Sequence, residues 1–469
     1  MTARVLRLLS LAGLVALALG LLPAVARAAA PTQITGTSPD GSRYLIEVPA
    51  AWNGTLLLYS HGYSFTPVLV PTDSPDNTSS HPVIHDWLLA HGYALAGSTY
   101  ANQGIGWSLQ SAFPDQIDVL DTFAKKVGRP ARTIAWGHSL GGMITAGLVQ
   151  LHPERFQGAL PMCGVLAGGV GVWNQGLDSA FAFETLLAPG SSLELVHITN
   201  AAADLGTALG ILAQAQTSSA GRARVALAAA LADIPGWFDP ASPEPAARDF
   251  VSQELNQASW LRSPDLLFSF FGRQELERRA GGNPSWNAGV DYRMQLALST
   301  GHEEVAALYR EAGLSLEDDL STLNQAGRIT ADAAAVDYLT RFIVYNGELG
   351  LPVLTLHTSG DGLVEVTDEH AYADVVRAAG DNRLLRETFV HRAGHCTFTA
   401  AETIAALQTL VGRLDTGRWE NSTSPAAMNR LAAGLGPALN TVPSAFVRFH
   451  PANFLRPFDA RSAPAGERP

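Results

Sequence analysis

Lysine is almost missing from this sequence of 469 residues. Only Lys125 and Lys126 occur among 31 basic residues, against 43 acidic ones, and the formal net charge is −12. A chain without a basic patch does not complement nucleic acid or anionic lipid, so we expect neither as a partner. Charged residues make up 16% of the chain and hydrophobic residues 47%, which excludes a disordered chain and allows a large buried core.

Cysteine is also scarce, because Cys163 and Cys396 are the only two in the sequence. Two thiols form at most one disulfide and cannot build a cysteine-based zinc site. No group of residues in the sequence has the spacing of metal ligands. We therefore expect neither a metal nor a cofactor.

One long apolar run is present, and it lies at the N-terminus. Leu8–Leu22 follows two arginines and precedes the small residues around Ala26–Ala28, which is typical of a signal peptide cleaved before Ala29. The run has about 15 residues and a membrane span needs roughly 20, although an uncleaved anchor is the alternative. We expect residues 1–28 to be removed. The mature chain would then be secreted, without membrane insertion, into a compartment where disulfides form.

Apolar strands alternate with amphipathic helices in two separate stretches, residues 29–168 and 345–418. Strands that are apolar throughout predict a mostly parallel sheet with helices on both faces. Residues 169–344 show helical periodicity without a clear strand, which predicts a helical cap inserted into the α/β domain. Residues 419–469 are rich in proline and alanine, and we expect an irregular tail there.

Ser139 lies in the stretch Gly137–Gly141, which reads G-x-S-x-G between a predicted strand and a predicted helix. This context predicts a sharp turn that lifts a nucleophilic serine above the sheet edge, with small residues on either side to avoid collision. The helix N-terminus below it favours developing negative charge. An ordinary tight turn would show the same letters, so the assignment depends on partners elsewhere in the chain.

A serine hydroxyl needs a base to become a nucleophile, and the base needs an orienting acid. In this architecture the chain order is serine, acid, histidine, with each residue in a loop after a strand. Asp361 follows the apolar run 352–357, and His395 follows a strand that ends near Val390. We therefore predict a triad of Ser139, Asp361 and His395.

Other residues are alternatives for the acid and the base. Glu365 and Asp368 are spare acids close to Asp361, and His391 is a rival base. We favour His395 because it lies in the loop beyond a glycine, whereas His391 is still within the predicted strand. An aspartate that only caps a turn remains the alternative for Asp361.

The oxyanion of an acyl-transfer reaction needs hydrogen-bond donors. We predict the backbone N–H of Leu140, directly after the nucleophile, and that of Tyr63 in the loop after an early strand. A plain strand terminator at His61-Gly62 is the alternative for this loop. Trp107 follows another predicted strand, and we expect Trp107 and Tyr63 to contact substrate.

These motifs, in this order, resemble the α/β-hydrolase superfamily over Thr55–Gly164 and Leu351–Leu414. The resemblance implies an α/β-hydrolase fold whose cap is inserted after the strand that follows the nucleophile helix. A cap makes a roofed, mostly apolar pocket. The "HGYS" segment resembles the oxyanion segment of cutinase-type polyester hydrolases, in which an aromatic residue at the Tyr63 position walls the acyl pocket.

His395-Cys396 resembles the histidine end of tannases and feruloyl esterases. In that family a cysteine beside the nucleophile is bridged to the cysteine beside the histidine, whereas here His138 precedes the serine and Cys163 ends the next strand. Because the carboxyl ends of parallel strands converge on one edge of the sheet, we predict a Cys163–Cys396 disulfide. Two buried free thiols are the alternative.

The leading interpretation is a secreted serine hydrolase that cleaves carboxylic esters, small or polymeric, with an apolar or aromatic acyl group. The second is a secreted serine peptidase, similar to capped aminopeptidases, which needs cap carboxylates to hold the substrate amine. The acids available in the cap for that role are Glu275, Glu277, Glu303 and Glu304. A binding protein without activity is a third reading, and the sequence does not define the oligomeric state.

Overall fold

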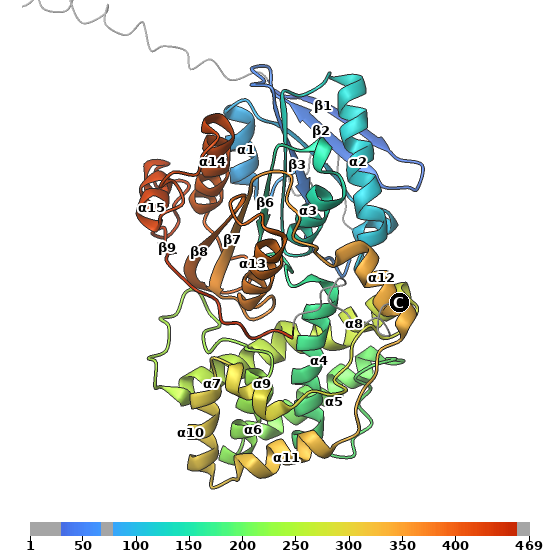
Figure 1. The fold of residues 1–469 in the computed structure, drawn as a ribbon, viewed down its shortest axis with the longest axis vertical. Helices are drawn as coiled ribbons and strands as arrows, with labels where there is room; N and C mark the ends of the chain where they lie inside the picture. Colours follow the sequence, from blue (N-terminus) through green and yellow to red (C-terminus); the bar gives the residue numbers. More distant parts are fainter. Residues whose placement is uncertain (1–29, 67–77, 457–469) are drawn as a thin grey trace, which may run out of the picture.

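A computed structural model describes residues 30–66 and 78–456 of the chain (Figure 1). The predicted signal peptide lies outside these ranges. The centre is a nine-stranded sheet of order β1-β2-β4-β3-β5-β6-β7-β8-β9. The strands are β1 Thr32–Thr37, β2 Arg43–Val48, β3 Thr55–Ser60, β4 Ala94–Ser98, β5 Arg132–His138, β6 Gly158–Met162, β7 Val353–Gly360, β8 Leu385–Ala393 and β9 Phe446–Val447. Neighbours from β4 to β8 pair in parallel, and β1, β2 and β9 pair antiparallel, so the mostly parallel α/β-hydrolase sheet is confirmed.

Helices cover both faces of the sheet. Successive strand residues point to opposite sides, so the apolar side chains of one strand need a helix layer on each face. In β3, Leu56 and Leu58 belong to the apolar layer on the side of α2, α3, α12 and α13, whereas Leu57 and Tyr59 belong to the layer on the side of α1, α14 and α15. These helices are α1 Pro82–Ala90, α2 Leu109–Lys126, α3 Leu140–Leu151, α12 Ala333–Ile343, α13 Thr367–Ala379, α14 Ala400–Thr416 and α15 Pro425–Gly434. The parallel strands β3, β4 and β6 are buried along their whole length, which explains why their sequences are largely apolar.

A helical lobe occupies the chain between β6 and β7, and Figure 1 shows it below the sheet in green and yellow. It consists of α4 Gly168–Leu187, α5 Ala201–Ala215, α6 Ser219–Ala230, α7 Phe250–Trp260, α8 Arg273–Ala280, α9 Tyr292–Leu298, α10 His302–Ala312, α11 Leu316–Gln325 and α12. Two π-helical turns, η4 Leu261–Asp265 and η5 Phe268–Gly272, join α7 to α8. The lobe has an apolar core of its own that includes Phe181, Leu227 and Tyr309. Within the described ranges, no helix is long and apolar enough to cross a membrane.

The tail is more ordered than its composition predicts. Ser424 and Pro425 begin α15, because proline at the first helical position loses no hydrogen bond and already has a helical φ. Phe446–Val447 then adds β9 to the edge of β8. The expectation of an irregular tail is therefore wrong for this part, since the proline that suggested irregularity starts a helix.

Beyond β9 the chain crosses from the sheet to the helical lobe (Figure 1). Gln295 of α9 donates a hydrogen bond to the carbonyl of Phe454, at 3.1 Å. Arg456 donates to the carboxylate of Asp178 on α4, with Nε 3.0 Å and a terminal nitrogen 2.8 Å from Oδ2. We call residues 446–456 the tail strap, because they connect the edge of the sheet to the helical lobe.

Candidate active site

Ser139 lies at the sharp turn between β5 and α3. Its backbone adopts φ 56° and ψ −128°, a region that residues with a Cβ rarely occupy. The turn also needs its flanking glycines. A Cβ on Gly137 would lie 2.5 Å from the carbonyl oxygen of Ser60, and one on Gly141 would lie 1.9 Å from the same atom. The sequence therefore folds this segment into a tight turn that presents the serine hydroxyl at the carboxyl edge of the sheet.

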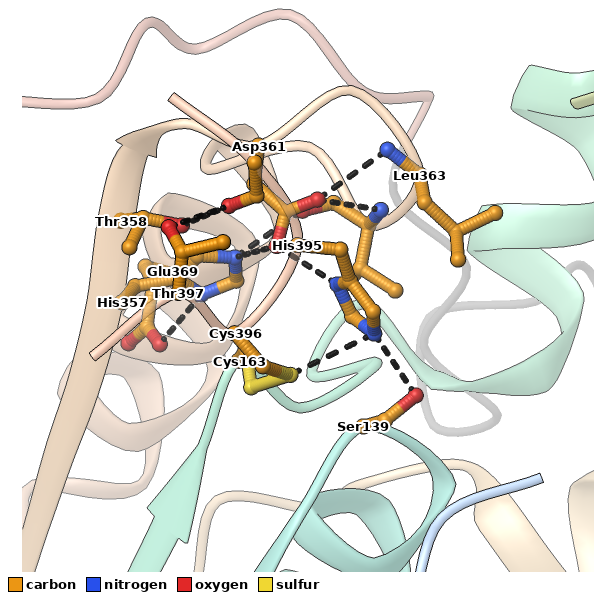
Figure 2. Close-up of polar contacts among 12 residues, drawn as sticks. Ser139, Cys163, His357, Thr358, Asp361, Leu363, Glu369, His395, Cys396 and Thr397 are labelled. Atoms are coloured by element: carbon orange, nitrogen blue, oxygen red, sulfur yellow. Dashed lines mark hydrogen bonds and ion pairs between the residues drawn. A yellow bond between two sulfur atoms is a disulfide. The ribbon is translucent and has the colours of Figure 1, made fainter. Parts of the chain in front are cut away.

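The structure brings the three predicted triad residues together (Figure 2). Asp361 follows β7 directly, and His395 lies two residues beyond the end of β8. His395 Nε2 is 2.8 Å from Ser139 Oγ, and His395 Nδ1 is 2.7 Å from Asp361 Oδ2. This is a continuous hydrogen-bonded chain from carboxylate to imidazole to hydroxyl, the arrangement that general-base activation of a serine requires.

Asp361 is fully buried and stays ionised because of its surroundings. Its Oδ1 accepts the backbone N–H groups of Leu363 and Val364, each at 3.1 Å. Burial alone would raise the pKa of Asp361, but the charges and hydrogen bonds of His395 and His357 lower it to about 2. A carboxylate at neutral pH can therefore hold the His395 ring and balance the positive charge that the ring gains during catalysis.

A second histidine, which the sequence analysis did not single out, supports Asp361 from behind. His357 of β7 is fully buried, with Nδ1 3.0 Å from Glu369 Oε1 and Nε2 3.5 Å from Asp361 Oδ2. Burial would lower the pKa of His357, but hydrogen bonds and charge from the two carboxylates raise it to about 10. A buried imidazolium thus lies between two carboxylates. Its signal in the sequence is a histidine inside an apolar strand, four residues before the triad acid.

Two other histidines near the triad, His391 and His138, have partners of their own. His391 is within β8, and its half-exposed ring pairs with Glu244 at 3.1 Å. His138, beside the nucleophile, stacks on the ring of Tyr59 and shares a 2.5 Å hydrogen bond with its hydroxyl. Burial lowers the pKa of His138 to about 4, so this ring is neutral. Its role is to pack and hold the turn.

The two segments that carry the predicted oxyanion donors both lie beside Ser139. A Cβ on Gly62 would be 3.4 Å from Ser139 Cβ, so the loop that carries Tyr63 passes directly against the nucleophile. His61 anchors this loop, because its ring nitrogens lie 2.8 Å from the carbonyl oxygen of Gly62 and 3.3 Å from that of Thr99. Leu140 is the first residue of α3, and the first N–H groups of a helix have no partner within the helix. Both segments therefore lie next to the nucleophile, and the two oxyanion donors stay a prediction.

The predicted disulfide is present. Cys163 and Cys396 are bonded, with their Cα atoms 5.5 Å apart, and this bond ties the His395 loop to the end of β6 (Figure 2). Cys396 Sγ is 3.4 Å from His395 Nε2. In the described part of the chain, these three residues are the one grouping of metal-ligand residue types. Sulfurs joined in a disulfide are not thiolates, so the grouping is not a metal site.

An apolar pocket opens from Ser139 between the sheet edge and the helical lobe. It has about 890 Å³ of empty space, its open mouth included. Tyr63 and Trp107, the two predicted substrate contacts, both line it, together with Trp173 and Phe268. The Tyr63 ring meets the rings of Trp107 and Phe268 edge to face, each at 5.0 Å. Aromatic walls of this kind suit a flat or apolar substrate group.

The fold and the Ser-His-Asp arrangement define a serine hydrolase of the α/β-hydrolase superfamily. The model of the Prolyl oligopeptidase family matches residues 88–168, which include the nucleophile turn. The o-phthalyl amidase of Xanthobacter agilis is 30% identical over 442 residues, covering 87% of this chain and 93% of that protein. The chain belongs to the same family as this amidase.

Solved structures with a similar fold include two esterases. An esterase from Aspergillus oryzae is 14% identical, with a TM-score of 0.37, over 82% of this chain and 79% of its own. The rice cell wall degrading esterase LipA from Xanthomonas oryzae is also 14% identical, with a TM-score of 0.36, over 82% of this chain and 89% of its own.

Proposed function

We propose that this serine hydrolase cleaves carboxylic esters, small or polymeric, whose acyl group is apolar or aromatic. The observation that carries the proposal is the hydrogen-bonded series Ser139–His395–Asp361, which opens into a pocket walled by aromatic side chains. An ester carbonyl seated against Ser139 would place its acyl group against Tyr63 and Trp107. We propose these two residues as substrate contacts.

The reaction follows from the geometry. His395 Nε2 takes the proton of Ser139 as its oxygen attacks the ester carbonyl. The backbone N–H groups of Leu140 and Tyr63 stabilise the negative oxygen of the tetrahedral intermediate. His395 then returns the proton to the leaving alkoxide, and an acyl-enzyme remains on the serine. A water molecule repeats these steps on the acyl-enzyme and releases the carboxylic acid.

Amide hydrolysis by the same triad is the second candidate. It is favoured by the relation to o-phthalyl amidase, whose name describes an enzyme acting on amides of an aromatic acyl group. The chemistry differs in the leaving group, because an amine must be protonated by His395 before it departs. The aromatic pocket suits both candidates.

The cap carboxylates named above for a peptidase have other partners. Glu275 accepts the N–H of Trp107 at 2.8 Å, Glu277 accepts that of Ile198 at 3.1 Å, and Glu304 accepts the side-chain amide of Gln257 at 3.0 Å. Glu303 is exposed on α10. None of the four is among the described residues that line the pocket, so they do not support the peptidase interpretation.

We also propose that the chain works outside the cytoplasm. The Cys163–Cys396 bond supports this location, because structural disulfides persist in oxidising compartments and are rare in reducing ones. Detection of the mature chain outside the cells that express it, with a new N-terminus at Ala29, tests the proposal and the predicted cleavage together.

A matched substrate pair tests ester against amide. The measured quantities are kcat/KM for p-nitrophenyl butyrate and for butyryl p-nitroanilide, with the wild type and with Ser139→Ala. The proposal expects faster hydrolysis of the ester than its greater intrinsic reactivity alone provides, and loss of both activities in the variant. An anilide rate equal to or above the ester rate would replace the ester proposal with the amidase candidate.

A further inference from the structure

Two acidic side chains, one from the helical lobe and one from the sheet domain, line the otherwise apolar pocket. Asp265 is the last residue of η4 in the helical lobe, and Glu365 belongs to the loop after β7, four residues beyond the triad acid. Both share the pocket with Ser139. Acidic side chains are expensive to place in an apolar cavity unless something binds them.

Asp265 has no hydrogen-bond partner for either carboxylate oxygen among the described residues, and both oxygens are buried. Buried polar atoms are nearly always satisfied in folded proteins, so an unsatisfied carboxyl group that faces a substrate pocket points to a ligand. Glu365 is buried as well, with 7% of its surface exposed.

The charges around this pair define what it can bind. Burial and the nearby Asp361 raise the pKa of Asp265 well above its usual value, and burial together with Asp265 and Asp368 does the same for Glu365. In the described part of the chain no arginine, lysine or histidine lines the pocket. An anion would meet only like charge here, whereas a cation would restore both carboxylates to their ionised form.

We propose that Asp265 and Glu365 bind a protonated amine of the substrate, so that the preferred substrates carry an ammonium group near the scissile carbonyl. The inference rests on the proposed Ser139 chemistry and narrows its substrate class to amino-bearing acyl compounds. The aromatic walls would contact the rest of the molecule. The ammonium group would lie beside Asp265, whose carboxyl oxygens have no other partner among the described residues.

The test compares leucine methyl ester with methyl 4-methylpentanoate, which differ only by the amino group. Released acid is measured at pH 6.5, where an α-amino group with a pKa of about 8 is protonated. The wild type is expected to favour the amino ester at least about tenfold in kcat/KM. Asp265→Asn and Glu365→Gln are each expected to bring that ratio close to one, mainly through a higher KM. In the wild type the ratio should fall as the pH rises through the amine pKa.

The variants and the two esters also distinguish a failure of the ammonium site from a failure of the proposed function. Asparagine and glutamine imitate a protonated carboxyl group, so an unchanged ratio in both variants would show that charge is not used and would overturn the ammonium site. A wild type that cleaves both esters equally would overturn it too, while leaving the proposed function intact. Failure to cleave either ester would contradict the proposed function itself. Glu303→Gln, an exposed cap position, is the matched control and should keep the wild-type ratio.

Discussion

Ser139 combines a strained backbone with an unobstructed side chain. Holding a non-glycine residue at φ 56° costs about 1–3 kcal/mol, which the packing of β5 and α3 must offset. This backbone conformation places the Ser139 hydroxyl 2.8 Å from His395 Nε2, where the pocket opens. The same turn therefore strains the Ser139 backbone and makes its hydroxyl accessible to a substrate.

Ser139→Ala should abolish hydrolysis and leave the fold intact, because alanine fits the turn but has no nucleophile. We expect a loss of about 10⁴–10⁶-fold in turnover with p-nitrophenyl butyrate. Circular dichroism and the thermal unfolding temperature serve as controls for folding. A variant with near-native activity would contradict the assignment of the nucleophile.

His357 makes a second prediction at the scale of single residues. Its pKa of about 10 in the folded chain is above the value of about 6.5 in an unfolded one, so its stabilising contribution is complete below pH 6.5 and disappears as the pH rises through 10. At pH 6 the unfolding free energy of the wild type should therefore exceed that of His357→Gln. This difference should shrink by a few kcal/mol between pH 6 and pH 10, because each unit of pKa shift corresponds to about 1.4 kcal/mol.

Urea unfolding at pH 6, 8 and 10 measures this difference. His391→Gln changes a half-exposed histidine of the same strand and should show no comparable trend with pH. A difference between the wild type and His357→Gln that stays constant across the range would mean that His357 is not the buried cation described above.

Among the elements, β6 and the loop after β8 are joined by the only covalent cross-link between the described segments. The bridged residues are separated by 233 positions, and the closed loop contains the whole helical lobe. Chain entropy gives such a loop about 5 kcal/mol as an upper estimate, since measured values often fall short for long loops. Because Cys396 neighbours the base, the bond also holds His395 in place.

Replacing both cysteines, Cys163→Ser with Cys396→Ser, should lower the thermal unfolding temperature and the turnover together. The loss of turnover is expected because the His395 loop is no longer fixed to β6. Thiol titration of the unfolded, unreduced wild type should find no free thiol, and reduction should release two. Two free thiols before reduction would rule the bond out.

Local sequence signals predict those elements whose environment is uniform along their length. β3 and β5 are buried on both faces and appear as apolar runs, and the turn at Ser139 has its glycines in place. The triad follows because each member comes directly after such a strand. Asp265 could not be found this way, since its position over the pocket depends on how the lobe packs on the sheet, which leaves no periodic pattern. The pairing of His357 with Glu369 could not be predicted from the sequence either. The pattern of apolar residues along a strand shows that a residue is buried, but not which polar group it contacts.

At the scale of the whole molecule, the tail strap links the two lobes through a buried charge. Asp178 is 1% exposed, and although burial raises its pKa, Arg456 opposes the rise, leaving it at about 6. Arg456→Ala should therefore cost about 3 kcal/mol of unfolding free energy, because it leaves a buried carboxyl group without its ion-pair partner. Arg430→Ala, at an exposed position of α15, is the matched control. Equal stabilities for the two variants in urea unfolding would contradict a clamping role for the strap.

The order in which this chain is synthesised bears on when the enzyme can first act. Ser139 and His395 are 256 residues apart, so at about 5–20 residues per second the nucleophile is made roughly 10–50 s before its base. The strap residues Phe454 and Arg456 follow later still and complete the contact between the lobes. A nascent chain thus displays its serine turn and its apolar pocket lining without a working catalytic system. Activity therefore cannot begin before the His395 loop has been made and has folded against Ser139.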